Sequence, residues 1–237
     1  MSERTDSFLK ALREEIDGRR FFREIMLPQN AYPVAPQHPD EKIAAIGKAY
    51  EELLEHPLVK RFLRKKPKLY LWKEGFYASD CPAGMLASDK VITLSHACID
   101  MPPRELKALL AHEIGHALVL HGHLRRIEKQ ALTAKEQELS AEKLAVVLSG
   151  DPEACKNRYM KLVAHNDLTL DQPMSGRGDQ AYPSPDTFYE FIDEIAKRME
   201  TPEGKRSVEK EIENQLLGEY QALFPHHFNR AMGNIRA

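Results

Sequence analysis

One stretch constrains the fold of this chain more than any other: residues 106 to 123 read LKALLAHEIGHALVLHGH. His112 and His116 are four positions apart, so in a helix their imidazoles share one face, about 6 Å apart, and can bind one small cation. Glu113 directly follows the first of them. The pattern His-Glu-x-x-His is typical of zinc peptidases, but it is short enough to occur by chance. Its surroundings therefore decide whether it is a metal site.

A catalytic zinc needs a third protein ligand besides the two histidines, and an open position for water. In the metzincin branch of zinc peptidases this ligand is a further histidine, in a pattern that requires Gly at position 119 and His at position 122. The chain has Val119 and Gly122 instead, which excludes that branch. The third ligand must come from another segment.

The next predicted helix offers a pair of glutamates four positions apart in the stretch EQELSAEKLAVVL, residues 136 to 148. Glu138 is a candidate third ligand, and Glu142, one turn later, is a candidate acceptor for an imidazole N–H. Burying both without partners would be costly. The spacing alone fits equally well with both side chains facing water beside Lys135 or Lys143.

The rest of the pattern predicts an α+β chain that is mostly helical and has a small β-sheet. KLYLW (68–72) and KVITLS (90–95) have the β-branched and aromatic residues of strands, and DCPAGMLAS between them supplies a turn and a further extended piece. The prolines between 28 and 39 predict a loop, as does the turn-rich segment 170–186. Apolar periodicity and capping residues predict helices at 4–16, 40–54, from 57, from 100–103 through 118, 133–150, 151–166, 187–200 and from 201.

Composition excludes several classes of protein. The net charge of -2 over 237 residues lacks the basic excess of a nucleic-acid-binding protein. Mean hydropathy is -0.51, and no apolar run approaches the ~18 residues of a membrane span. The opening MSERTDSFLK does not read as a secretory signal, and the three cysteines form no Cys-x-x-Cys. We expect a cytoplasmic protein with no nucleic-acid partner and no integral membrane segment, of undetermined oligomeric state.

The metal motif and the helix after it resemble a known family over roughly residues 84 to 165. ELKALLAHEIGHALVLH and ELSAEKLAVVLSGDPEACKNRYMKL are similar to the gluzincin family of the CAAX prenyl endopeptidase and the heat-shock protease HtpX, peptidase family forty-eight. That family has His-Glu-x-x-His, then Glu-x-x-x-Asp in a helix, then a restart similar to GDPEA. The matching positions are His112, Glu113, His116, Glu138 and the run from Gly150 to Ala154. The chain departs from it at Glu142, where the family has Asp, and many relatives are membrane-embedded.

The resemblance implies a zincin-type metallopeptidase domain built around an active-site helix. Zn²⁺ would be held by His112, His116 and Glu138, with Glu142 as the acceptor that orients an imidazole. Glu113 would be the general base for a metal-activated water that hydrolyses peptide bonds of a protein or peptide substrate. The strand at 90–95, or the extended residues just before it, would be an edge to which an unfolded substrate segment adds.

The C-terminal stretch LFPHHFNRAMGNIRA, residues 223 to 237, is similar to a His-Pro and Arg segment that approaches the active site in this family. The resemblance implies that His226 or His227 donates a hydrogen bond to the oxyanion. Arg230 would anchor the segment or the substrate. A helix end at the surface is an equally good interpretation of these residues.

We expect residues 1–66 to form a helical segment with the Pro-rich loop, and residues 67–237 to form the metallopeptidase domain, together as one compact unit. The loops at 28–39 and 170–186 are long enough to cover the active site until a partner arrives.

Two other interpretations of the sequence remain. Antirepressor peptidases of mobile elements also read HEIGH before a helical Glu, but they continue Glu-x-x-Ala-Asn and end in Leu-Met-Pro, which ELSAEKLAVVLSGDP lacks. A non-catalytic protein-binding module with a zincin fold is the other. Glu113 argues against it, because a purely structural metal has no use for a base.

Overall fold

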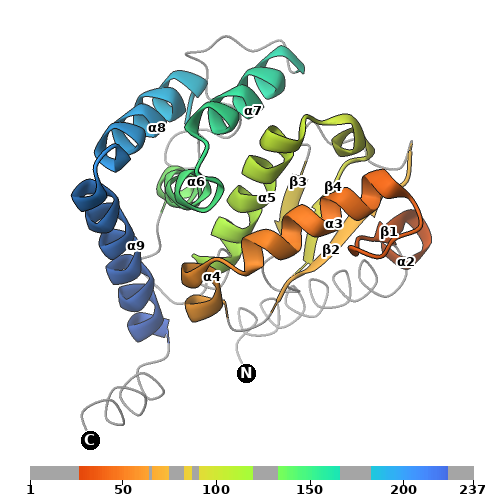
Figure 1. Cartoon of the computed structure of the whole chain (residues 1–237), viewed down its shortest axis with the longest axis horizontal. Helices are drawn as coiled ribbons and strands as arrows, with labels where there is room; N and C mark the ends of the chain where they lie inside the picture. Colours follow the sequence, from red (N-terminus) through yellow and green to blue (C-terminus); the bar gives the residue numbers. More distant parts are fainter. Residues whose placement is uncertain are drawn as a thin grey trace, which may run out of the picture.

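Helices make up most of the described chain, and a small β-sheet lies at one side of them (Figure 1). The computed structural model describes residues 27–63, 66–74, 83–86, 91–119, 133–165 and 183–223. Its strands are β1 (Ala31–Pro33), β2 (Lys68–Trp72), β3 (Ala83–Leu86) and β4 (Val91–Leu94). Its helices are α2 (Leu27–Asn30), α3 (Glu41–Leu54), α4 (Pro57–Phe62), the 3-10 helix η2 (His96–Asp100), α5 (Pro103–Leu118), α6 (Ala134–Ser149), α7 (Pro152–His165), α8 (Pro185–Met199) and α9 (Pro202–Leu223). The prediction of a mostly helical α+β chain with a small sheet is confirmed.

The sheet has four strands in the order β1-β2-β4-β3. β2 and β4 are parallel, and the other two pairings are antiparallel. Successive side chains of β2 point to opposite faces of the sheet. Leu69 and Leu71 pack in the larger cluster of buried apolar side chains, together with the helices. Trp72 packs on the other face, with Val91 and Ala31. Both central strands are therefore buried, as their apolar sequences require.

One detail of the sheet differs from the sequence prediction, and a second detail completes it. Residues 28–33 are not all loop, because α2 is followed by β1, which pairs with β2 at the edge of the sheet. Pro33 is tolerated there because an edge strand needs ladder hydrogen bonds on one side only. The extended piece expected before KVITLS is β3. Among the described strands it is the outer one, while β4 lies inside, so β3 and not β4 forms the edge of the described sheet beside α5.

α3 begins where its sequence predicts. The Asp40 carboxylate caps the helix by accepting from the backbone N–H of Lys42 (2.9 Å) and Ile43 (3.1 Å). The apolar stripe of α3 packs in the same buried cluster as β2, β4 and α5; it consists of Ile43, Ile46, Tyr50 and Leu53. Segments on both sides of residue 66 thus contribute to one core.

α5 begins further along the chain than the candidate cap Asp100 predicts. Pro103 is the first helical residue and Pro102 precedes it, in agreement with the preference for proline in a first turn. The candidate cap Asp100 instead ends η2 and forms an exposed ion pair with Lys42, 2.6 Å apart. Because Asp100 lies three residues before the first residue of α5, its carboxylate does not cap that helix.

α6 packs closely against α5, and its ends are well defined. Thr133 and Glu136 form a capping box at its start, and Gly150 ends it with φ of 66°. A Cβ built on Gly115 of α5 would lie 2.8 Å from the carbonyl oxygen of Ala141 in α6. A glycine at 115 therefore permits the short separation between the two helices.

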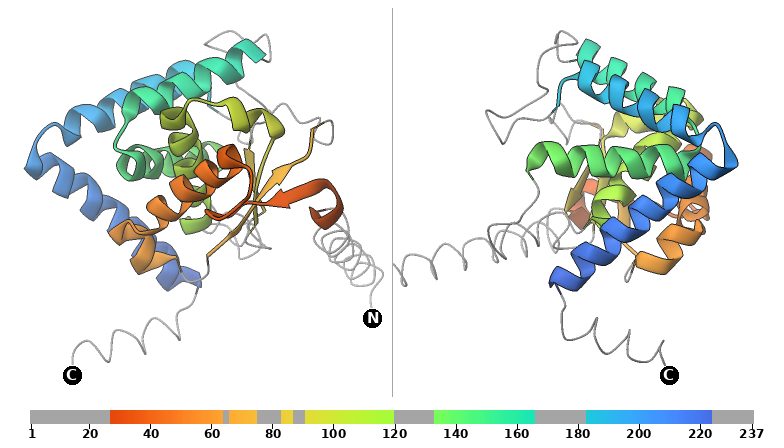
Figure 2. Two further views of the ribbon diagram at one scale, coloured as in Figure 1. Left: turned by 45° about the vertical axis from the view of Figure 1, so that its right-hand side comes forward. Right: turned by 90° about the vertical axis from the view of Figure 1, so that its left-hand side faces the viewer.

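The last three helices cover the side of α6 that faces away from the sheet (Figure 2). α7 restarts at Pro152, as predicted, and Asp151 before it pairs with Arg104 of α5 through two contacts of 2.5 and 2.9 Å. Tyr159 of α7 stacks on Phe188 of α8, with ring centroids 4.2 Å apart. Within the described ranges, no helix combines the length and the apolar character needed to cross a membrane.

Candidate metal centre

The two histidines of the motif lie on the buried face of α5, as their spacing predicts. His112 is 7% exposed and His116 is 6% exposed. Their Nε2 atoms are 3.0 Å apart, and the rings are nearly perpendicular, at 86°. Both Nε2 atoms are therefore directed toward a common point.

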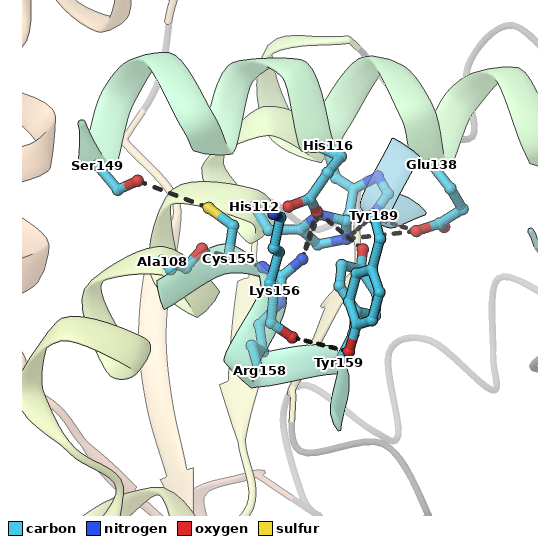
Figure 3. A network of polar contacts seen from close by, with 11 residues as sticks. Ala108, His112, His116, Glu138, Ser149, Cys155, Lys156, Arg158, Tyr159 and Tyr189 are labelled. Carbon is cyan, nitrogen blue, oxygen red and sulfur yellow. Dashed lines mark hydrogen bonds and ion pairs between the residues drawn. The ribbon is translucent and has the colours of Figure 1, made fainter. Parts of the chain in front are cut away.

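Glu138 of α6 completes this arrangement. Its Oε2 atom lies 3.3 Å from Nε2 of His112 and 3.4 Å from Nε2 of His116. Figure 3 shows the three side chains converging between the two helices. A tetrahedral zinc with bonds of about 2.0–2.1 Å needs its ligand atoms about 3.3 Å apart. The three separations fit that requirement, and this is the one such group of His, Cys, Asp or Glu among the described residues.

Glu142 is fully buried, with 0% exposure, and Glu138 is 6% exposed, so neither of these two carboxylates faces water. The Oε2 atom of Glu142 is 2.9 Å from Nδ1 of His112. The same oxygen accepts hydrogen bonds from Arg158 and from the hydroxyl of Tyr159, the latter at 2.8 Å. The predicted role of Glu142 as an acceptor for an imidazole N–H fits this geometry.

Charge partners dominate the ionisation of this centre. Burial by itself raises the pKa of Glu142, but Arg158, His112 and Tyr159 outweigh it and lower the pKa to about 2. Burial likewise opposes ionisation of Glu138, whose pKa is nevertheless held well below its usual range by His116 and His112. For His112, burial and Arg158 lower the pKa, yet Glu138 and Glu142 raise it to about 9. His112 thus lies between two carboxylates that favour a cation at this position.

Glu113 is buried beside the pair, at 4% exposure. Its Oε2 atom has no hydrogen-bond partner among the described residues. A buried carboxylate oxygen without a partner is unfavourable in a folded protein. It fits a centre in which water, substrate or both supply the missing donor.

Several predicted residues fall outside the described ranges. His226, His227 and Arg230 belong to the segment after residue 223, and their roles remain predictions. The loop at 170–186 is described only from residue 183 onward.

Sequence reasoning did not assign a role to Arg158 or Tyr159. A signal was nevertheless present, because Arg158 follows Ala154 by four positions and Cys155 by three, and so lies on the apolar face of α7. Arginine on such a face is almost always paired. Arg158 is 5% exposed and lies beside Glu142.

The geometry defines a class of site: a buried group of two imidazoles and one carboxylate that could hold a single metal ion, with a further carboxylate adjacent in sequence. Comparison of the chain with protein-family models, with curated proteins and with solved structures gave no match.

Proposed function

We propose that the protein is a zinc-dependent endopeptidase with a zincin-type fold, in which His112, His116 and Glu138 bind Zn²⁺. The observation that carries the proposal is the convergence of three buried ligand atoms at mutual distances of 3.0 to 3.4 Å. Two histidines and a glutamate are the donor set of a catalytic rather than a closed structural zinc site. The resemblance to the gluzincin family of CAAX prenyl endopeptidase and HtpX supports the same assignment.

When bound, zinc supplies the acidity that makes a water molecule nucleophilic at neutral pH, and it polarises the peptide carbonyl. The chain supplies the proton transfers. Glu113 accepts the proton of the attacking water and returns it to the leaving amine. Glu142 holds the proton on Nδ1 of His112, which leaves Nε2 free as a ligand.

The substrate in this proposal is an extended segment of protein or peptide. β3 is the outer strand of the sheet and contacts α5. A substrate segment can pair with the outer edge of β3 through its backbone, an interaction that selects conformation more than sequence. This predicts broad activity on unfolded proteins.

The test is the substitution Glu113→Gln. We expect it to leave one zinc per chain in metal analysis and to reduce cleavage of an unfolded protein such as casein by at least about 100-fold, the usual size of a general-base contribution. Glu190→Gln on the exposed surface of α8 is the control and should retain full activity. Comparing new protein termini produced by the parent and by the Glu113 variant in a proteome identifies the cleavage sites.

Full activity of Glu113→Gln would refute the catalytic assignment. Zinc bound without turnover of any unfolded protein would favour the alternative of a protein-binding module.

A further inference from the structure

α7 contributes a buried polar pair to the metal centre that the proposed mechanism does not use. Arg158 and Tyr159 are 5% and 3% exposed, and both contact the fully buried Glu142. A guanidinium with so little access to water calls for a reason, since burying a charge is costly even when it is paired.

The contacts of Arg158 join three helices at one point. One terminal nitrogen donates to Glu142 of α6, and the other donates to the backbone carbonyl of Ala108 in α5, at 3.0 Å. Ala108 lies one helical turn before His112, so this contact fixes the turn of α5 that carries the first histidine. Figure 3 shows Arg158 reaching from α7 toward Ala108 and His112.

Three polar contacts of Glu142 with described residues converge on a single oxygen. Oε2 is shared by Arg158, by the Tyr159 hydroxyl at 2.8 Å and by Nδ1 of His112 at 2.9 Å. An ionised carboxylate only accepts hydrogen bonds, so the His112 contact requires a proton on Nδ1. The two donors from α7 fix the position of the oxygen that selects this tautomer.

We propose that Arg158 and Tyr159 are positioning residues of the metal centre, which hold Oε2 of Glu142 against Nδ1 of His112 and thereby increase the affinity for the metal. The inference rests on the proposed zinc site. It adds a third helix to a centre whose predicted residues lie on α5 and α6. The positive charge of Arg158 also compensates the charge of the fully buried Glu142.

The experiment measures zinc affinity by competition with a chromophoric chelator for the full chain and its variants. Loss of partners that orient metal ligands typically weakens binding 10- to 100-fold. We expect a weakening of about this size for Arg158→Met and about 3- to 10-fold for Tyr159→Phe. The cobalt-substituted Arg158 variant should also show an altered visible absorption spectrum. Arg61→Met is the matched control, because Arg61 pairs with Glu213 at the surface and should leave the affinity unchanged.

A double-mutant cycle separates positioning from general packing. If Arg158 acts through Glu142, then Arg158→Met in a Glu142→Gln background should weaken zinc binding by no more than about 2-fold further. An equal loss in both backgrounds overturns the proposal. So does an Arg158 variant whose metal-free form melts earlier while its zinc affinity and cobalt spectrum are unchanged, since that is a purely structural effect.

Tyr159→Phe keeps the inference testable if Arg158→Met does not fold, because it removes one hydroxyl and leaves the ring that stacks on Phe188. Zinc bound as tightly by Tyr159→Phe as by the parent would then overturn it. A parent chain that binds no zinc overturns both this inference and the proposed function. A parent that binds zinc without hydrolysing peptides overturns the function alone.

Discussion

At the level of single residues, Glu138 decides whether the two histidines form a metal centre or a histidine pair. Its Oε2 atom is within 3.4 Å of both Nε2 atoms. Glu138→Gln replaces an anionic ligand by a neutral amide, and we expect zinc affinity to fall by more than the 10- to 100-fold typical of orienting partners. Equilibrium dialysis against zinc measures this. Glu153→Gln, on the exposed side of α7, should bind as the parent does, and equal binding by the Glu138 variant would exclude Glu138 as a ligand.

Cys155 gives a second prediction at this scale. Burial, with a smaller effect from the charge of Glu142, raises the pKa of this thiol from 9.0 to about 12. The pKa is raised only in the folded chain, so the folded state favours the protonated thiol. This preference contributes to the free energy of unfolding below pH 9, and the contribution is lost as the pH rises from 9 toward 12. At pH 8 the folded thiol should react with iodoacetamide at least ~100-fold more slowly than in the unfolded chain, as measured by mass spectrometry of the Cys155 peptide. Equal labelling rates would show that this face of α7 opens readily.

The histidine pair could be predicted from sequence because its geometry is local to one helix. The choice of Glu138 and Glu142 depended on which face of α6 is buried, and spacing left this undecided. Arg158 escaped prediction because its partners, Glu142 and Ala108, lie far away in sequence and only packing brings them together.

At the level of elements, the separation of α5 and α6 sets the geometry of the site. Gly115→Ala would place a Cβ 2.8 Å from the Ala141 carbonyl, so α6 must shift and carry Glu138 and Glu142 with it. Overpacking of this kind costs about 1–3 kcal/mol, against a gain of up to about 1 kcal/mol in helix propensity. We expect a lower free energy of unfolding in urea and weaker zinc binding.

Gly218→Ala is the control for this prediction, because a Cβ there meets no atom within 4 Å. It should leave stability unchanged or slightly raised, and zinc binding unaltered. A Gly115 variant that behaves like the Gly218 variant would show that the two helices can separate without disturbing the centre.

The element boundaries show where local signals suffice. A capping residue or a proline determines a helix end through contacts within one helical turn, so such ends can be predicted from the local sequence. The helices begin or end as predicted at Asp40, Pro57, Gly150 and Pro152. β1 was missed because a three-residue strand exists only through its pairing with β2, which lies far along the chain. Asp100 is not the cap of α5, because η2 extends to Asp100 and α5 begins only at Pro103.

At the level of the whole molecule, the candidate metal centre lies between α5, which packs on the sheet, and α6, which packs on α8. A cation bound there connects the helix on the sheet side to the helix on the α8 side. Its removal should therefore lower the melting temperature of the whole described fold. At a zinc concentration 1,000 times the Kd, binding stabilises a folded protein by about 4 kcal/mol. In a chain of 237 residues about 1 kcal/mol shifts Tm by roughly 2–4 °C, and a strong chelator should therefore lower Tm by roughly 8–16 °C.

Calorimetry of the full chain with zinc and with chelator measures this shift, and Glu138→Gln provides the control. The variant should gain much less of this stabilisation at the same zinc concentration, because Oε2 of Glu138 is the atom that brings α6 into the centre. Its Tm should therefore change much less between the two conditions than that of the parent. A parent Tm that does not respond to zinc would mean that the convergence of the three side chains is maintained by their own ion pairs and does not bind a metal. A variant that responds as strongly as the parent would place the stabilising zinc elsewhere in the chain.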